Sequence, residues 1–382
     1  MERLLRPLAE GAPEALGLAD DAAVIPSRPG FDLVVTKDAI VEGVHFLPDD
    51  RPEEVARKLL RVNLSDLAAK GAEPFGYFLA VAWPAHYGEA EREAFVGGLA
   101  ADQAEFGVKL LGGDTVCTPG PFTASVTMMG WTPAGQMVRR DGARPGQVLL
   151  VTGTIGDGGL GLKAAQGFLE GEGAGMLAAR YRRPEPRLGL REALRAHASA
   201  CIDISDGLIA DAIHIEEAGK VALQIDLERL PLSPAAQSWL ALQPSAAAGL
   251  VELASAGDDY ELLLTADVAA ALPLAVAAAE AGFALTPIGR IHEGQGATAI
   301  LFSLPFMARA TRGRQVRERG GAEPRGLLIT SPTQPATRST LPTREREKGV
   351  LSPHAPPPDS RLRRPGHRHA LPRRRAWQEG GR

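Results

Sequence analysis

Acidic residues recur beside glycine or at the ends of apolar runs in the first 260 residues of the chain. They lie at Asp20-Asp21, Asp38, Asp66, Gly112-Gly113-Asp114, Asp203-Ile204-Ser205-Asp206-Gly207 and Gly257-Asp258-Asp259. A single Asp beside Gly is most often a turn or a helix cap, but a series of this kind is harder to assign to turns alone. Carboxylates suit hard cations such as Mg²⁺, which take oxygen ligands and keep several waters. The pattern therefore predicts a site for metal ions and phosphates, and with it phosphoryl-transfer chemistry.

One of these motifs combines two acids with a hydroxyl group. Asp203 and Asp206 lie three residues apart where an apolar strand is predicted to end, so they could hold one or two metals. The Ser205 hydroxyl between them could donate to a phosphate. His45 follows Asp38 by seven residues. A lone histidine is usually packed or exposed without a role, but this one lies close to a predicted metal ligand.

A glycine-rich stretch, Gly156–Gly161, fits the G-x-G-x-x-G fingerprint of dinucleotide-binding folds and follows a predicted strand. The acid-ended second strand that should follow about 20 residues later is missing, because residues 162–183 have the pattern of helix and loop. We therefore interpret the stretch as a tight connection between a strand and a helix. The phosphate loop G-x-x-x-x-G-K-[ST] does not occur in the sequence.

The acidic motifs lie on alternating predicted strands and helices. In the first half we expect helices over 52–69 and 89–106, and strands over 32–36, 76–83, 108–111 and 122–131. In the second half we expect strands near 147–152, 201–204, 222–226, 260–265 and 285–288. This alternation indicates a mixed α/β or α+β architecture. A Gly-Ala-Arg-Pro-Gly stretch at 142–146 marks the boundary, which predicts domains over residues 1–143 and 144–305.

Composition limits the class of protein. With 382 residues, 45% of them apolar and 23% charged, the chain can form two domains with sizeable cores. Its two cysteines provide no disulfide framework, which fits a reducing compartment. Residues 1–25 lack the pattern of a signal sequence. The most apolar stretch, Val268–Ala279, is interrupted by Pro273 and is too short to span a membrane. We expect a soluble, cytoplasmic protein.

Charge is divided unevenly along the chain. Residues 1–305 carry 24 Lys and Arg against 40 Asp and Glu, whereas residues 306–382 carry 18 against 6. The acidic body argues against nucleic acid as the main partner and is compatible with metal binding. Residues 306–382 are rich in Arg and Pro and lack apolar periodicity, so we expect a disordered, solvated tail. Its arginine clusters come without interleaved aromatic residues, which disfavours a nucleic-acid arm.

Seven motifs, in the same order along the chain, resemble those of the thiamine-monophosphate kinase family. They are Gly17–Ala23, Thr36–Phe46, Asn63–Ala72, Leu111–Thr115, Arg140–Ala143, Asp203–Leu208 and Gly257–Leu262. The match spans about residues 1–300 and is highly specific. The resemblance extends to the wider superfamily of aminoimidazole-ribotide synthetase-like ATP enzymes.

This resemblance implies a homodimer of two-domain subunits that binds ATP and several Mg²⁺ ions in a cleft between the domains, the first of which would hold metal and ATP. It implies metal ligands at Asp21, Thr36, Asp38, Asp66, Asp114, Asp203 and Asp206. It implies nucleotide contacts at Gly113, Asp114, Arg140 and Ser205, with Phe106 in place of an aromatic residue near the adenine. It implies substrate contacts at His45 and Asp258, and thiamine monophosphate as the acceptor.

Three positions depart from the family pattern. Asp258 stands where glutamate is common, and is one methylene shorter. Lys37 replaces a more usual threonine, which leaves a backbone contact but removes a hydroxyl. The family ends with an aromatic segment that covers the substrate, whereas here Ile300–Ser303 is followed by the Arg/Pro-rich tail. We hypothesise that a reading-frame change near codons 303–306 replaced the original ending, which the coding DNA can test.

The predicted mechanism is direct in-line transfer from ATP to a phosphate monoester, with Asp206 and Arg140 as the catalytic side chains. Three alternatives remain open. One is another ATP-dependent enzyme of the superfamily, forming an amidine or selenophosphate; the latter type would show a Cys or selenocysteine near the N-terminus, and none precedes Cys117. The second is a non-enzymatic metal-binding module. The third is a folded but catalytically weakened product of the altered C-terminus.

Overall fold

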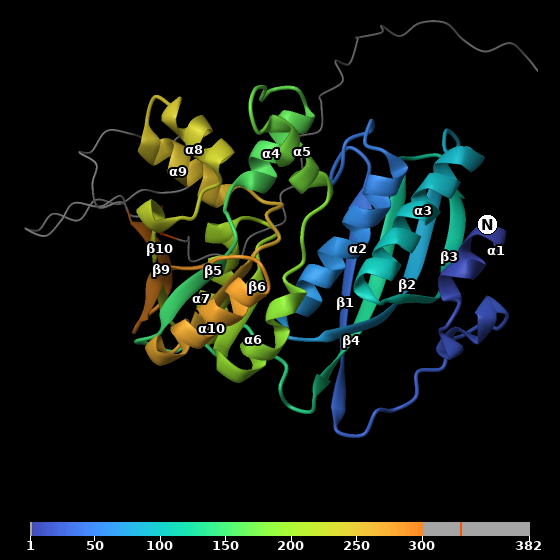
Figure 1. Ribbon diagram of the computed structural model, residues 1–382, viewed down its shortest axis with the longest axis horizontal. Coiled ribbons are helices and arrows are strands. Elements are labelled where there is room, and N and C mark those ends of the chain that lie inside the picture. The colour runs from blue at the N-terminus through green and yellow to red at the C-terminus, as the bar shows by residue number, and fades with distance from the viewer. Residues whose placement is uncertain (1, 301–328, 331–382) are drawn as a thin grey trace, which may run out of the picture. The chain divides into compact units, whose positions relative to one another are not determined.

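The computed structural model describes residues 2–300 and 329–330 of the chain. All of them fall in one compact unit, Met1–Thr333. The second unit, Gln334–Arg382, and most of the predicted tail 306–382 lie outside the described residues. The described part has the predicted mixed α/β architecture, built from two halves that each contain a sheet (Figure 1).

The N-terminal half contains a four-stranded sheet with two helices on one of its faces (Figure 1). Its strands, in spatial order, are β1 (Phe31–Val41), β4 (Thr123–Pro133), β2 (Glu73–Pro84) and β3 (Lys109–Thr118). Its helices are α2 (Pro52–Ala69) and α3 (Glu89–Phe106). The short elements α1 (Glu2–Leu5), η1 (Arg6–Ala9) and η2 (Pro13–Leu18) precede them, and η1 and η2 pack against β3. Only the pair β2–β3 is parallel, because α3 connects those two strands.

The two long helices have clear ends in the sequence. Helix α2 begins at Pro52 with Glu53 and Glu54 in its first turn, where the missing N–H of proline costs nothing and acids favour the helix dipole. Helix α3 ends at Gly107, whose φ of 71° is left-handed and which donates its N–H to the carbonyl of Gln103. Both helices span the predicted residues, 52–69 and 89–106.

The four-stranded sheet has one face against the helices and one outer face. Side chains alternate along a strand, so Asp38 and the buried Ile40 of β1 face α2, whereas Val35 and Lys37 face outward. Tyr77, Phe95 and Phe122 are fully buried between the sheet and the helices. On the outer face, alanines of η1 and η2 cover part of the sheet. Val35 of β1 and Val116 of β3 remain 55% and 52% exposed.

The C-terminal half contains a mixed sheet with helices around it (Figure 1). Its strands, in spatial order, are β11 (Ile329–Thr330), β10 (Gly296–Ile300), β7 (Ala222–Asp226), β9 (Leu285–His292), β5 (Val148–Thr152), β8 (Leu262–Ala266) and β6 (Ala198–Asp203). Its helices are α4 (Asp157–Ala165), α5 (Ala174–Arg182), α6 (Arg191–His197), α7 (Leu208–Gly219), α8 (Pro234–Ala241), α9 (Ala246–Ser255) and α10 (Ala271–Glu280), with short turns η3 (Leu188–Leu190), η4 (Leu227–Arg229) and η5 (Val268–Ala270).

Strands β5 and β8 of this sheet are buried on both faces. Along β8 every residue is buried, and the two sides of the sheet belong to separate apolar clusters. One cluster includes Ile215 of α7, and the other includes Leu274 of α10. No helix among the described residues is long and apolar enough to cross a membrane. The cytoplasmic location stays a prediction.

Helix α2 joins the two halves. It packs against β1 and β4 on one side and against β6, α5 and α6 on the other. Polar side chains along it are therefore buried, including Lys58, Arg61, Asn63 and Ser65. Its C-terminal Lys70 donates to the carbonyl of Cys201 in β6 over 2.8 Å. This helix brings the acids of both halves together.

Candidate active site

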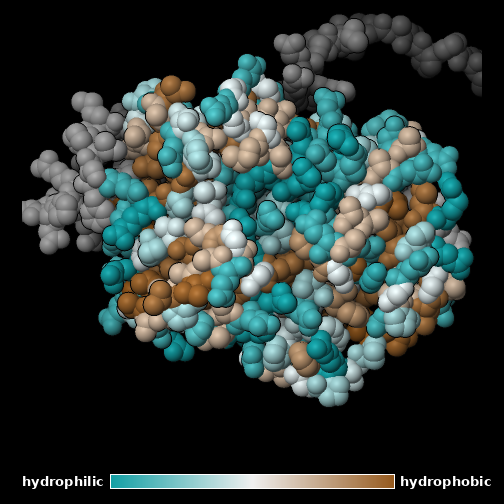
Figure 2. All heavy atoms as spheres, in the orientation of Figure 1, coloured by the Kyte–Doolittle hydropathy of each residue, from teal (hydrophilic) through white to brown (hydrophobic). Residues whose placement is uncertain are grey.

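A pocket of about 210 Å³ lies where α2, β1 and the C-terminal half meet. Its lining residues are Asp38, Ala39, Ile40, His45, Lys58, Val62, Asp66, Asp203, Ser205, Asp206, Asp258 and Tyr260. Seven of the predicted site residues are among them. Figure 2 shows that hydrophilic residues gather on the surface where α5 approaches α2, at the same junction between the halves. Motifs separated by up to 220 positions thus share one polar cavity.

Hydrogen bonds connect the acids from the two halves. The Thr36 hydroxyl of β1 donates to the Asp66 carboxylate of α2. The neighbouring Ser65 hydroxyl donates across the junction to Oδ2 of Asp203 over 2.9 Å. Asp38 is held through its backbone N–H, which donates to Oδ1 of Asn63 over 3.1 Å. The predicted metal ligands Thr36, Asp38, Asp66, Asp203 and Asp206 therefore form one group, which we call the cleft group.

The cleft group carries more negative charge than its surroundings balance. Burial, together with the charges of Asp66 and Asp206, raises the pKa of Asp38 to about 6. Burial and the charge of Asp66 raise the pKa of Asp203 to about 8, although the Ser65 hydroxyl opposes this. Buried carboxylates that repel one another are stabilised by a bound cation. The donors are carboxylate and hydroxyl oxygens without sulfur, so the residues fit Mg²⁺.

Helix α7 supplies an acid that the sequence reasoning missed. Oδ2 of Asp211 accepts the backbone N–H groups of Ser205 and Asp206 over 3.0 and 3.1 Å, which holds the loop before the helix in place. Burial raises the pKa of Asp211 to about 7, although these hydrogen bonds oppose the shift. Ligand atoms of Asp206, Asp211 and His214 lie within 4.8 Å of one another. Asp211 lies in the first turn of α7, five residues after Asp206. An acid in that position could have been predicted to lie close to the loop that contains Asp206.

The opposite side of the pocket is built by the segment before β8. Oδ1 of Asp258 accepts from the Tyr260 hydroxyl over 3.2 Å, and Oδ2 lies 3.4 Å from Nζ of Lys58. His45 accepts the backbone N–H of Val41 at Nδ1 over 3.1 Å, which leaves Nε2 as the donor of the neutral ring. Both predicted substrate residues, His45 and Asp258, therefore line the pocket with fixed orientations.

The glycine-rich stretch contacts an acid of this same segment. Oδ2 and Oδ1 of Asp259 accept the backbone N–H groups of Gly156 and Gly158 over 2.8 and 2.9 Å. Helix α4 begins at Asp157, directly after β5 and a short turn. The stretch is thus the predicted connection between a strand and a helix, and its anion site is filled by the chain's own carboxylate.

The remaining predicted residues do not line this pocket. Asp21 lies in the segment between η2 and β1, and Gly113 and Asp114 lie on β3, the edge strand farthest from β1. Through the strand register, Asp114 is aligned with Ala80, Ser125 and Ala39, which places it on the outer face. We call Asp21, Gly113 and Asp114 the outer group.

Phe106 and Arg140 lie at other borders of the junction. Phe106 ends α3 and packs beneath the guanidinium of Arg61, whose Cζ lies 4.9 Å from the ring centroid. Arg140 is exposed in the connection between the halves. Burial lowers the pKa of Lys70 and the charge of Arg140 adds to this shift, whereas the same charge opposes the rise in the pKa of Asp211. Arg140 is thus near the cleft group, whereas Phe106 lies in the layer of helices.

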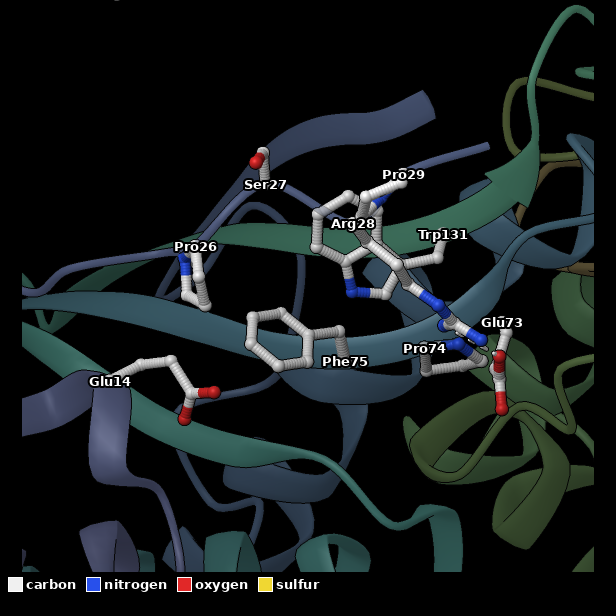
Figure 3. A pocket seen from close by; sticks show the side chains of 9 residues that line it. All are labelled: Glu14, Pro26, Ser27, Arg28, Pro29, Glu73, Pro74, Phe75 and Trp131. Atoms are coloured by element: carbon white, nitrogen blue, oxygen red, sulfur yellow. Dashed lines mark hydrogen bonds and ion pairs between the residues drawn. The ribbon is translucent and has the colours of Figure 1, made fainter. Parts of the chain in front are cut away.

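A second pocket, of about 440 Å³, lies on the side of the N-terminal sheet away from α2 (Figure 3). Phe75 and Trp131 form its apolar floor, with ring centroids 5.8 Å apart. Arg28 at its rim pairs with Glu73 over 3.4 Å. The pocket contains none of the predicted site residues, and its only lining cation is already paired, so it does not resemble a phosphate site.

Comparison with known proteins identifies the class to which this arrangement belongs. Residues 19–132 match the N-terminal domain of AIR synthase related proteins, and residues 144–301 match the C-terminal domain of the same proteins. Both halves of the fold, and the cleft between them, are therefore those of the AIR synthase related class.

Individual relatives are more specific. The thiamine-monophosphate kinase of Caulobacter vibrioides is 56% identical over 298 residues, which cover 78% of this chain and 84% of the relative. The crystal structure of the thiamine-monophosphate kinase from Stenotrophomonas maltophilia is 39% identical with a TM-score of 0.70, and the match covers 78% of this chain and 94% of that one. The structure of AaThiL complexed with AMPPCP and TMP is 30% identical with a TM-score of 0.65, over 72% and 85% of the two chains. The chain belongs to the thiamine-monophosphate kinase family.

Proposed function

We propose that the chain transfers the γ-phosphoryl group of ATP to the phosphate of thiamine monophosphate, giving thiamine diphosphate and ADP. The convergence of Asp38, Asp66, Asp203 and Asp206 from both halves into one pocket carries this proposal. The AaThiL structure with AMPPCP, an analogue of ATP, and TMP supports it. We assign residues 1–143 to the domain that binds metal and ATP, and residues 144–305 to the second domain.

The cleft group would hold Mg²⁺ through its carboxylates. Mg²⁺ held there would supply positive charge to neutralise the phosphate charge that develops during transfer. Its importance follows from the charges involved: two unit charges 4 Å apart repel by about 4 kcal/mol at an effective dielectric constant of 20. Asp211 and Ser65 would keep the metal-binding acids in position, because they hydrogen-bond to the Ser205–Asp206 backbone and to Asp203.

The transfer needs no general base. A phosphate monoester has a second pKa of about 6, so the acceptor is already largely ionised near neutral pH. An acceptor oxygen forms a bond to the γ-phosphorus while the bond from that phosphorus to the bridging oxygen breaks, and ADP leaves with the electron pair. We propose that the Ser205 hydroxyl and the Nε2–H of His45 donate to phosphate oxygens, and that Arg140 binds a phosphate with its planar fork.

We propose further that the protein acts as a homodimer. The outer face of the N-terminal sheet exposes Val35 and Val116, and apolar side chains of this kind favour contact with a second copy. Asp114 of the outer group lies on the same face of the sheet as these side chains. Asp21 lies in the segment that precedes β1. Dimer formation through this face would let the outer group complete the cleft of the other subunit.

Turnover of the full chain with ATP, Mg²⁺ and thiamine monophosphate tests the function, with thiamine diphosphate measured by chromatography. A second form that carries the family's aromatic ending in place of residues 303–382 separates the alternatives. Activity in this form alone would identify the natural chain as a catalytically weakened product. Absence of activity in both would reject the proposed function. Direct transfer also predicts that γ-labelled ATP leaves no label on the protein.

A further inference from the structure

Lys58 is a buried cation at the centre of an acidic pocket. Its side chain is 2% exposed, and burial lowers its pKa. The other charged residues that line the pocket are Asp38, Asp66, Asp203, Asp206 and Asp258. A buried charge persists only where nearby groups repay its desolvation. The groups that contact the Lys58 ammonium therefore indicate the role of this side chain in the pocket.

Lys58 contacts three groups, of which His45 and Asp258 line the proposed substrate side of the pocket. Nζ donates to the carbonyl of His45 over 2.9 Å and lies 3.4 Å from Oδ2 of Asp258. It also lies 3.7 Å from the centroid of the Tyr181 ring, within the range of a cation–π contact. Hydrogen bonds use two of the three donors of the ammonium, and the Tyr181 ring lies against another side of Nζ. These contacts hold Lys58 toward the His45 carbonyl and the Asp258 carboxylate rather than toward a phosphate.

The same contacts link the two halves of the protein. Lys58 and His45 belong to the N-terminal half, whereas Tyr181 and Asp258 belong to the C-terminal half. The Tyr181 hydroxyl also donates to the carbonyl of His45, over 3.3 Å. Removal of the ammonium would therefore take one partner from the His45 carbonyl and one from the Asp258 carboxylate at the same time.

Asp258 is further fixed by its backbone. Its φ is +66° and that of Tyr260 is +49°, both in the left-handed region that L residues rarely adopt. The backbone N–H of Asp258 donates to the carbonyl of Ser205 over 2.9 Å. Each carboxylate oxygen has one partner, the Tyr260 hydroxyl or Lys58, and each keeps a second lone pair. A carboxylate held in this way is a fixed acceptor for an amino group.

We propose that Lys58 is a positioning residue that holds Asp258 in place to recognise the exocyclic amino group of the acceptor's heteroaromatic ring. The inference rests on the proposed function and deepens it, because it assigns the selection of an amino-substituted ring to the Lys58–Asp258 pair. A site that hydrogen-bonds a substrate N–H discriminates strongly against an analogue that lacks it.

The experiment compares two acceptors, thiamine monophosphate and oxythiamine monophosphate, in which oxygen replaces the amino group. Lys58→Met keeps the length of the side chain and removes the charge. We expect its KM for thiamine monophosphate to rise about tenfold, with the KM for ATP changed less than about twofold, and its preference for the amino acceptor to fall by a similar factor. The matched control is Arg57→Met on the same helix, because Arg57 pairs with Asp102 and Glu105, away from the pocket.

A double-mutant cycle with Asp258→Asn decides between positioning and a general loss of structure. If Lys58 acts through Asp258, the double variant is no more impaired in selectivity than Asp258→Asn alone. Additive losses, or equal rises in KM for ATP and the acceptor, would overturn the proposal. If Lys58→Met fails to fold, Lys58→Gln carries the test, since it removes the charge and keeps a polar group in the buried position. A wild-type chain without kinase activity would instead reject the proposed function.

Discussion

The cleft group and the outer group are both acidic, yet the protein positions them in different ways. Members of the cleft group are buried or half-buried, connected by hydrogen bonds, and drawn from both halves around α2. Asp21 and Asp114 are exposed, the first in the segment before β1 and the second on the outer face of β3. Within one subunit only the first group gathers in a pocket. The difference teaches that acidic motifs of similar composition can lie on separate faces of one subunit, and the proposed dimer would bring the two groups together.

The largest effect is expected for the cleft group itself. Asp206→Asn removes a metal-binding charge at the loop between β6 and α7, and should lower kcat by about a thousandfold, because metal stabilisation of the transition state amounts to several kcal/mol. Steady-state kinetics with saturating Mg²⁺ would measure it. Near-wild-type turnover in this variant would remove Asp206 from the metal site.

Mixing two inactive variants tests whether the outer group acts across a dimer. Asp114→Asn and Asp206→Asn should each be nearly inactive alone. If they act in trans, a refolded or subunit-exchanged mixture should recover about a quarter of wild-type activity, since about half of the dimers then contain one intact site of two. Recovery of no activity, with heterodimers demonstrated by differently tagged chains, would place both residues in the same subunit.

A smaller effect is expected from the exposed apolar face. Val35→Glu adds a charge to the outer face without touching the cleft, so it should weaken self-association and lower specific activity at low protein concentration. At high concentration the activity should return. Sedimentation and activity measured over the same dilution series would show this. Val268→Glu, at a side chain of η5 that is 60% exposed, provides the same substitution away from this face as a control. A monomer at all concentrations would contradict the dimer.

The smallest expected effect is a pH dependence of stability in the metal-free protein. The folded pKa values of Asp38 and Asp203, about 6 and about 8, lie above the ordinary value of 3.8. Because the folded protein holds these protons more tightly than the unfolded chain does, protonation of the two carboxyl groups stabilises the fold. This stabilisation is complete below about pH 4 and is lost as the pH rises through 6 and 8. Thermal unfolding in EDTA should therefore show decreasing stability from pH 5 to pH 8.5, and Mg²⁺ should stabilise more at the higher pH.

Asp203→Asn sharpens this measurement. The neutral amide cannot lose a proton, so the variant should show a weaker dependence on pH and a smaller effect of Mg²⁺ than the wild type. An effect of Mg²⁺ that is the same at both pH values would show that the cleft carboxylates are not the groups that bind it.

Much of the N-terminal half was predictable because local signals are strong there. Helices over 52–69 and 89–106 were confirmed, since proline and acids mark one start and glycine marks the other end. The gathering of Asp38, Asp66, Asp203 and Asp206 also follows the expectation of a single acidic cleft. The many short helices of the C-terminal half were not predicted, because their apolar periods are brief and their ends depend on tertiary contacts.

The position of Asp114 could not be predicted from the sequence. The pairing of β2 with β3 shifts between Tyr77 and Phe78, so Leu111 is an extra residue in β3. A bulge of one residue sends all later side chains to the opposite face. Lys58, in contrast, left a signal that was missed. It lies three residues after Val55 and four before Val62, on the buried face of α2. A lysine at an apolar position of this kind indicates a buried charge with a specific partner.

Asp258 and Asp259 are adjacent and identical in type, yet their side chains have different roles. With left-handed residues at 258 and 260, the two carboxylates point to different tasks: one faces the pocket, and the other caps the N-terminus of α4. Loss of the Asp259 carboxylate would leave the N–H groups of Gly156 and Gly158 without their acceptor, whereas loss of the Asp258 carboxylate would take a partner from Lys58. The Asp-Asp pair is therefore not two copies of one function, because one acid serves the fold and the other serves the pocket.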